Sequence, residues 1–129
     1  MRRYLAGIAL LLSISIAGCQ PQTEEPDGVN IPIDDDDIAG VVRSAAGVEA
    51  GVWVIAETSD LGTRFARIVV TDDEGRYVVP DLPAAEYELW VRGYGLADSA
   101  KVPASPGDRI DLIATTASDA ATAAAVYPA

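Results

Sequence analysis

The side chains that perform most hydrolytic chemistry are scarce in this chain, which has no histidine and a single cysteine. Ser-His and Cys-His nucleophile pairs are therefore excluded, because each needs an imidazole as its base. Ser99 and Lys101 stand two residues apart and could share a strand face, but a polar edge strand is the simpler interpretation. Glu86 and Glu88 could imitate a glycosidase pair, yet they fall on a predicted outer face where solvated charges are normal. We predict that the protein is not an enzyme and needs no cofactor.

The aspartate run at 34–37 is the candidate for a cation site. Calcium prefers several carboxylate oxygens, but an EF-hand-like loop needs alternate spacing, a glycine and a distal glutamate, and this run has none of them. We interpret the run as solvated charge and predict no metal site, with weak divalent binding as the alternative.

Two tryptophans are the best candidates for contact with a ligand. Trp53 alternates with Val52 and Val54, so it faces outward if the valines face the core. Trp90 lies in the alternating segment 86–92, on the face that carries the charged residues. Both indoles are therefore predicted on the outer surface of a sheet.

Three interpretations of this outward pair stay open. The indoles could form a platform for stacking a sugar, with Glu57, Glu88 and Arg92 as polar partners. They could instead form an interface with another domain, since a large exposed apolar patch usually marks a contact. In the reverse register both would lie in the core. We rank burial in the core or an interface first and sugar binding second. Phe65 could join the pair across the sheet, although 64–70 is apolar at both parities.

The segments that position these residues are short apolar runs separated by Gly-, Pro-, Asp- and Ser-rich connections. This spacing is typical of an all-β sandwich and not of βαβ units. At 72–75, for example, aspartates can bond their own backbone and Gly75 accepts a positive φ. A short helix is expected at 118–125, where alanine dominates. We expect a small, seven-stranded, antiparallel, Greek-key-like sandwich with strands at 38–43, 52–58, 64–71, 76–79, 86–92, 99–102 and 109–114.

The N-terminus has the pattern of an export signal. Arg2 and Arg3 precede an apolar run at 5–16, which is too short to span a bilayer comfortably and is followed by polar sequence. The tetrapeptide IAGC, which ends at Cys19, resembles the bacterial lipobox. That resemblance implies a diacylglycerated Cys19 thiol, cleavage just before it and acylation of the new amine. Several acyl chains anchor a protein stably where one would be marginal. We expect an exported protein anchored in the bacterial cell envelope, at the outer membrane in a Gram-negative source because Gln20 follows.

Residues 20–37 are rich in proline and acidic residues and poor in apolar ones, which predicts a disordered, self-repelling linker. Removal of residues 1–19, which hold two arginines and no acidic residue, changes the formal net charge from −11 to −13. Such a charge argues against nucleic acids and anionic lipid head groups as partners, because both are polyanions.

Four motifs together resemble the carboxypeptidase regulatory-like domain: IAGVV at 38–42, GVEAGVWV at 47–54, TDDEGRY at 71–77 and LPAAEYELWV at 82–91. The resemblance covers residues 38–114. It implies a transthyretin-like sandwich, grouped with carbohydrate-binding-like folds, that serves as an accessory module without catalytic residues. The string at 91–102 is similar to a subgroup in which this domain opens a longer exported protein.

The expected organisation is a signal peptide at 1–19, an acidic linker at 20–37, the sandwich at 38–114 and an Ala-rich tail at 115–129. Our hypothesis is a non-catalytic, membrane-anchored lipoprotein that acts as an interaction or scaffold module, as the N-terminal piece of a longer protein. The alternative is a surface lipoprotein that binds carbohydrate through its outer-face tryptophans. The expected partners are the membrane, through the lipid, and a protein or domain; the alternative adds a glycan.

Overall fold

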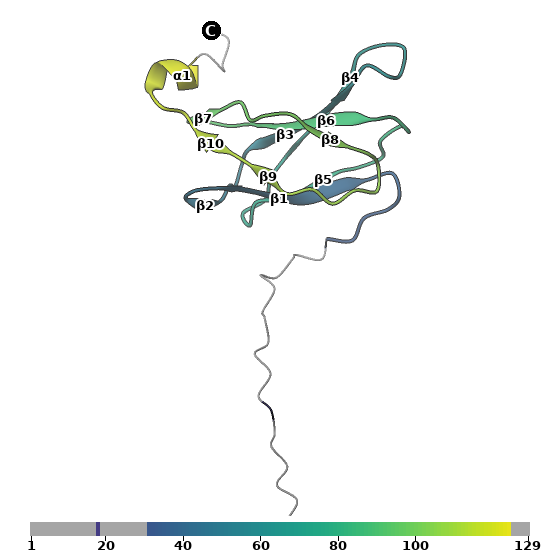
Figure 1. The fold of residues 1–129 in the computed structure, drawn as a ribbon, viewed down its shortest axis with the longest axis horizontal. Coiled ribbons are helices and arrows are strands. Elements are labelled where there is room, and N and C mark those ends of the chain that lie inside the picture. Colours follow the sequence, from purple (N-terminus) through teal and green to yellow (C-terminus); the bar gives the residue numbers. More distant parts are fainter. Residues whose placement is uncertain (1–17, 19–30, 125–129) are drawn as a thin grey trace, which may run out of the picture.

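The computed structural model describes residue 18 and residues 31–124, and the second range forms two packed β-sheets (Figure 1). One sheet has the order β2-β1-β5 with β9 also pairing on β1, and the other has the order β4-β3-β6-β8. The strands are β1 (Ile38–Ser44), β2 (Gly47–Val48), β3 (Trp53–Thr58), β4 (Phe65–Val70), β5 (Arg76–Val79), β6 (Tyr87–Arg92), β7 (Leu96–Ala97), β8 (Val102–Ala104), β9 (Leu112–Ile113) and β10 (Thr115–Thr116). The predicted all-β sandwich is confirmed.

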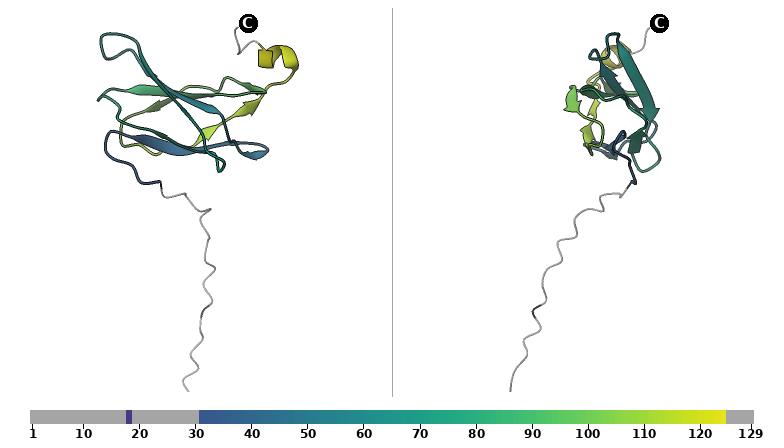
Figure 2. Two further views of the ribbon diagram at one scale, coloured as in Figure 1. Left: turned by 180° about the vertical axis from the view of Figure 1, so that it is seen from behind. Right: turned by 90° about the vertical axis from the view of Figure 1, so that its right-hand side faces the viewer.

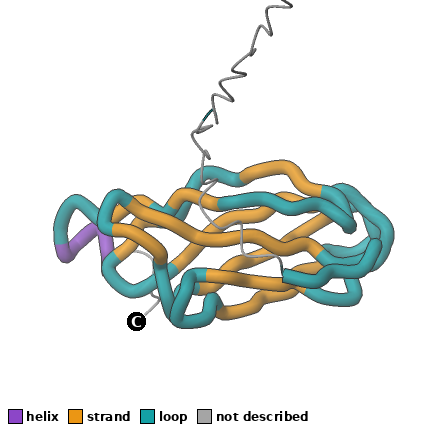
Figure 3. The backbone as a smooth tube through the Cα atoms, turned by 90° about the horizontal axis from the view of Figure 1, so that it is seen from below, coloured by secondary structure: helices purple, strands orange, loops and turns teal. Residues whose placement is uncertain are grey.

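The strands run along the long axis of a flattened molecule (Figures 2 and 3). The short pair of β7 and β10 and helix α1 (Ala120–Ala124) lie at one end of it. Neighbouring long strands are antiparallel, whereas β9 runs parallel to β1. Within the described ranges, no helix combines the length and apolarity needed to cross a bilayer.

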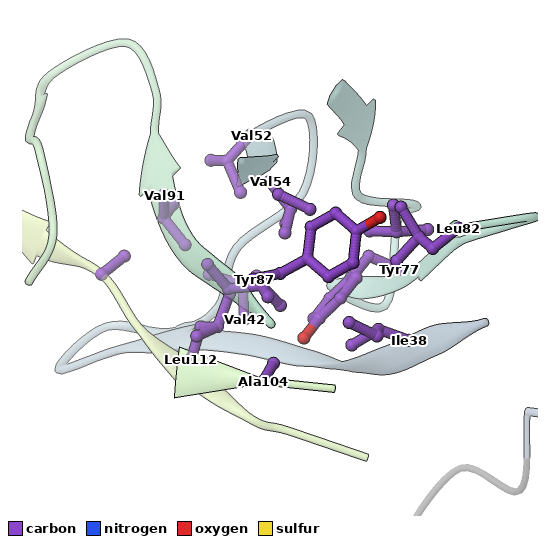
Figure 4. Close-up of a cluster of buried hydrophobic side chains, with 14 of the residues drawn as sticks. Ile38, Val42, Val52, Val54, Tyr77, Leu82, Tyr87, Val91, Ala104 and Leu112 are labelled. Atoms are coloured by element: carbon purple, nitrogen blue, oxygen red, sulfur yellow. The ribbon is translucent and has the colours of Figure 1, made fainter. Parts of the chain in front are cut away.

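One apolar core fills the space between the two sheets. Tyr77 from β5 and Tyr87 from β6 project into its centre (Figure 4). Each hydroxyl has a partner: Tyr77 donates to the Ile110 carbonyl at 2.6 Å and Tyr87 to the Pro83 carbonyl at 2.6 Å, as buried phenols normally do. Burial, with a smaller contribution from the nearby Asp111 carboxylate, raises the pKa of Tyr77, so this donor stays protonated. The remaining buried members are Ile38, Val42, Val52, Val54, Ala56, Val79, Leu82, Leu89, Val91, Leu96, Ala104, Leu112 and Ala114.

Five of the seven predicted strands match β1, β3, β4, β5 and β6 to within one residue at each end. The strand predicted at 99–102 is shifted, since β8 covers Val102–Ala104. Ser99 explains the shift. Its hydroxyl accepts the Val91 N–H at 2.8 Å, so this N–H bonds a side-chain oxygen instead of the backbone carbonyl of a paired strand. Pro103 is tolerated in β8 because β8 is an edge strand, where a missing N–H can face away from the ladder.

The strand predicted at 109–114 is reduced to the two residues of β9. The segment first bonds β1 through Ile110 N–H to the Ala39 carbonyl, at 2.8 Å. Then the Asp111 carboxylate accepts the Val41 N–H at 2.9 Å and replaces a backbone partner. This side-chain bond interrupts the ladder, and regular pairing resumes at Leu112.

The aspartate run at 34–37 contacts the sandwich. Leu82 N–H donates to the Asp36 carbonyl at 2.8 Å, and Gly107 N–H donates to the Asp37 carbonyl at 2.7 Å. The Asp37 carboxylate also accepts the Asp81 N–H at 3.2 Å. The sequence predicted these residues as the end of a free linker, but their backbone is bonded to two loops of the domain. The remainder of the predicted linker, 20–30, and Cys19 lie outside the described residues.

Helix α1 is shorter than the helix predicted at 118–125. Asp119 caps its N-terminus, because its carboxylate accepts the Thr122 N–H at 2.7 Å. That hydrogen bond lowers the pKa of Asp119.

Candidate functional site

The outer face of the four-stranded sheet carries both tryptophans, in cross-strand rows set by the β3 register. Trp53 on β3 stands between Val70 on β4 and Arg92 on β6. The next row on this face places Ile55 between Ile68 and Trp90, and the third places Glu57 between Ala66 and Glu88. The face is therefore apolar at one end and charged at the other.

We call Trp53, Ile55, Ile68, Val70 and Trp90 the outer-face patch. Ile68 and Val70 are each 56% exposed and Trp53 is 43% exposed, which are high values for large apolar side chains. Ile55 is only 5% exposed because its neighbours in the patch surround it. Contiguous exposed apolar surface of this kind usually marks a contact site on a soluble domain.

Trp90 is half-buried, and its ring is partly covered by Arg92. The Arg92 guanidinium carbon lies 4.8 Å from the ring centroid, within the range of a cation–π contact. Asp98 holds the guanidinium there through bonds of 2.8 and 2.6 Å. Among the described residues, the Trp90 Nε1–H is the buried side-chain polar atom that has no hydrogen-bond partner. With one ring face occupied and its N–H shielded, Trp90 is better suited to apolar contact than to hydrogen bonding a sugar.

The charged end of the face is organised around Glu57, which is 7% exposed. The Lys101 ammonium donates to one Glu57 oxygen, and Arg64 donates to the other at 3.0 Å. Lys101 also reaches Glu88 at 3.2 Å. An open hollow of about 500 Å³ lies beside this network, lined also by Thr58, Ser59, Asp60, Glu86, Tyr87 and Pro103.

The Lys101 hydrogen bond, followed by that from Arg64, lowers the pKa of Glu57 from its ordinary value of 4.5. A depressed folded-state pKa adds stability above the unfolded-state value, and this stability is lost as the pH falls through the folded-state value. We therefore expect Glu57→Gln to unfold more easily at pH 7, by about 1 kcal/mol, the usual net contribution of such bonds at a partly screened site. The difference from the wild type should shrink as the pH falls below 4.5.

Urea unfolding of both proteins across this pH range measures the effect. The matched control is Glu88→Gln, which also neutralises a Lys101 partner but at an exposed carboxylate with one bond. Equal losses in the two variants, or a Glu57→Gln loss that does not change with pH, would contradict the assigned role of Glu57.

The structure brings the predicted site residues together on one face of the sheet. Trp53 and Ile55 face outward while Val52 and Val54 are buried, so of the two registers that the sequence left open for β3 the outward one is observed. Glu88, Trp90 and Arg92 alternate on the same face of β6 and belong to the same surface. Whether these residues bind a ligand stays a prediction.

The Ser99–Lys101 pair is not assembled as a dyad. The Ser99 hydroxyl bonds the Val91 N–H and the Ala100 carbonyl, whereas the Lys101 ammonium bonds Glu57 and Glu88. Over residue 18 and residues 31–124, no cluster of three or more Asp, Glu, Cys or His side chains is arranged to hold a metal ion.

Phe65 does not join the tryptophans, and two residues of the patch were not predicted. Phe65 pairs with Thr58 on the opposite face of the sheet, and its ring meets Tyr87 edge-on at 6.3 Å. This orientation places Ile68 and Val70 outward. The segment 64–70 is apolar at both parities, so its own periodicity could not decide between the faces. Arg67 gave no usable signal, because it shares the inward face with Phe65, where its guanidinium bonds the carbonyls of Pro80 and Asp81.

No protein-family model matches the chain, and no curated protein matches its sequence. The resemblance to the carboxypeptidase regulatory-like domain therefore stays a prediction, while the β-sandwich itself is observed.

Several solved structures are similar to this chain at low identity. Catechol 1,2-dioxygenase from Pseudomonas arvilla is 13% identical, with a TM-score of 0.49 over 67% of this chain and 54% of the dioxygenase. The Bacillus anthracis TIE protein is 16% identical, with a TM-score of 0.45 over 63% of this chain and 16% of its own. A candidate carbohydrate-binding protein from Pseudomonas aeruginosa is 15% identical, with a TM-score of 0.42 over 63% of this chain and 89% of its own. This chain thus spans about half of the dioxygenase and a small part of the TIE protein, and none of the three assigns it a function.

Proposed function

We propose that this protein is a non-catalytic interaction module, tethered to a membrane of the bacterial cell envelope by lipid on Cys19, that docks a protein partner on the outer-face patch. The observation that carries the proposal is the exposure of Trp53, Ile68 and Val70 beside each other on one sheet face. Burying such side chains contributes roughly 25 cal/mol for each Å² of apolar surface removed from water. A partner that covers the patch would gain this burial free energy without the cost of ordering a flexible loop, because every residue of the patch lies on a paired strand.

The composition of the face favours a protein partner. Three of its members, Ile55, Ile68 and Val70, are aliphatic, which suits the apolar side chains found at the centre of protein interfaces. The charged groups at the other end, Glu57, Glu88, Lys101 and Arg64, would form a polar rim. A large aromatic residue such as Trp53 at the centre of an interface is typical of a binding hot spot.

A photo-cross-linking amino acid at position 53, incorporated in the native host, tests this docking surface. We expect a protein adduct of defined mass, because Trp53 lies inside the proposed contact. The control places the same amino acid at Ile113, which is 68% exposed but lies on the other sheet. Absence of adducts at position 53, or the same adducts at both positions, would contradict the proposed interaction surface.

Carbohydrate binding is the second candidate, and the exposed indole of Trp53 is the observation that favours it. Its polar partner would be Arg92, the cross-strand neighbour of Trp53. A glycan that stacks on this ring should change Trp53 fluorescence in a Trp90→Phe variant. Unchanged fluorescence across a glycan panel, together with a protein adduct at position 53, would remove this candidate.

A further inference from the structure

Strand β4 is an edge strand. Within the part of the chain that the structure describes it pairs with β3 alone, at one end of the order β4-β3-β6-β8. Thr71 N–H donates to the Val52 carbonyl at 2.9 Å, and in an antiparallel ladder every second residue bonds the same neighbour. The backbone groups of Val69, Arg67 and Phe65 therefore point to β3. Those of Ala66, Ile68 and Val70 point to the open edge, where no backbone partner occurs among residues 31–124, so each residue that is exposed on the outer face also offers an N–H and a C=O there.

The other sheet edges among residues 31–124 are protected and β4 is not. The opposite edge strand β8 carries Pro103 and is preceded by Lys101, while β5 ends directly before Pro80. Strands β2 and β9, beside β1, and the paired strands β7 and β10 are two residues long each. Proline, lysine and short length are the usual devices that prevent edge-to-edge pairing. Strand β4 has six residues and no proline, and the side chain of its one charged residue, Arg67, is engaged with the carbonyls of Pro80 and Asp81.

We propose that β4 is a self-association site at which two copies of this chain pair antiparallel, edge to edge, about a two-fold axis at Ile68. In this register Ile68 stands opposite Ile68 of the second copy, and Ala66 stands opposite Val70. The residues that point to the open edge then exchange their backbone hydrogen bonds with each other. The small Ala66 beside Val70 and the two β-branched Ile68 side chains make compatible cross-strand pairs. The two four-stranded sheets become one eight-stranded sheet, and the two outer-face patches become continuous.

Charge favours this arrangement over a parallel one. The whole chain carries −11, which opposes self-association, but no acidic residue occurs between Asp60 and Asp72. Antiparallel pairing about Ile68 brings the Arg64 end of each strand toward the turn of the other copy, which holds Asp72, Asp73 and Glu74. The Arg64 side chain is 78% exposed and pairs with Glu57 at 3.0 Å, while Asp72 and Glu74 pair with Arg76 in their own copy, so a contact between Arg64 and this turn would require an exchange of partners. A parallel pairing would instead place Arg64 beside Arg64. The contact is small, so it suits a weak dimer whose copies are concentrated by a shared membrane tether.

Cysteine cross-linking of the full chain in membranes tests the register. Opposite residues in such a pair have Cα atoms about 5.5 Å apart, within the range that a disulfide bridges. We expect Ile68→Cys to double in mass on a non-reducing gel after mild oxidation. We also expect Ala66→Cys and Val70→Cys, carried on two differently tagged copies, to form a mixed dimer. Ile113→Cys is the control for an exposed thiol elsewhere, and the wild type controls for Cys19.

A second variant distinguishes loss of dimer pairing from loss of the folded structure. Ile68→Lys places two like charges at the two-fold axis on an already exposed position, so it should abolish dimer sedimentation in detergent while the circular dichroism spectrum stays unchanged. The inference is overturned if Ile68→Cys stays monomeric, if it links only to another protein or within its own chain, or if Val70→Cys alone links more than Ile68→Cys. These results would leave the proposed docking function standing as long as position 53 forms its specific adduct. Loss of that adduct with an intact Ile68→Cys dimer would remove the docking function alone.

Discussion

Gly40→Ala is expected to destabilise the folded chain by at least about 3 kcal/mol, the upper end of the usual range for overpacking a core. An added Cβ would lie 1.8 Å from the Ile110 carbonyl oxygen and 2.6 Å from its carbonyl carbon. Both are backbone atoms, so no side-chain rotation can relieve the clash. The segment that leads into β9 would have to leave β1 and stretch its bonds to Ala39. Since a domain of this size is stabilised by only about 5–15 kcal/mol, much of its stability is at risk.

The same carbonyl also accepts the Tyr77 hydroxyl, and Tyr77 is the cross-strand partner of Gly40. Displacing Ile110 therefore weakens a core hydrogen bond as well as the β1 contact. Urea unfolding followed by tryptophan fluorescence measures the loss as a lower midpoint. Gly93→Ala is the control, because its Cβ would meet side-chain atoms of Leu96 and Val52 at 2.8 Å and no backbone atom, so a smaller loss is expected than from a clash with a hydrogen-bonded carbonyl. An equal shift of the two midpoints, or an unchanged Gly40→Ala midpoint, would contradict the assigned role of Gly40.

Features with a local cause could be predicted from the sequence. The turn at 72–75 forms as expected, because Asp72 accepts the Glu74 and Arg76 N–H groups and Gly75 has a φ of 74°. The strict alternation of β6 predicted which side chains are buried, since the pleat puts successive residues on opposite faces. The outward orientation of Trp53 was one of two registers that its valine neighbours allowed, and the burial of Val52 and Val54 decides between them.

Features with a distant cause could not be predicted. Asp111 interrupts β9 by bonding Val41, 70 residues away in the chain, and no pattern around Asp111 indicates that partner. The composition of residues 34–37 predicts a solvated linker. In the structure their backbone accepts hydrogen bonds from two distant loops, at Leu82 and Gly107. Two of the five residues of the outer-face patch were missed for a similar reason. The orientation of Ile68 and Val70 is decided by the β3 register and by Phe65 packing on Tyr87, and neither is encoded within β4.

Cys19→Ser is expected to abolish lipid attachment completely. In the lipobox interpretation the thiol receives diacylglycerol before the signal peptide is cut, so serine, which offers no thiol, should block both steps. The wild type should incorporate labelled palmitate and begin at Cys19, and the variant should incorporate none and keep residues 1–18. Metabolic labelling and the intact mass measure the two consequences separately.

The proposed anchor would determine how the outer-face patch works, because tethered copies would meet in two dimensions at a raised effective concentration. One acyl chain binds a membrane only weakly and reversibly, whereas several hold a protein stably, so the full lipid load matters. Ser15→Ala, in the same signal segment but without a thiol role, is the control and should behave as the wild type. A wild-type chain that begins at another residue, or that carries no lipid while Ser15→Ala matches it, would refute the anchor. The Ile68→Cys dimer would then have to form between freely diffusing copies, and its yield should fall as the chain is diluted.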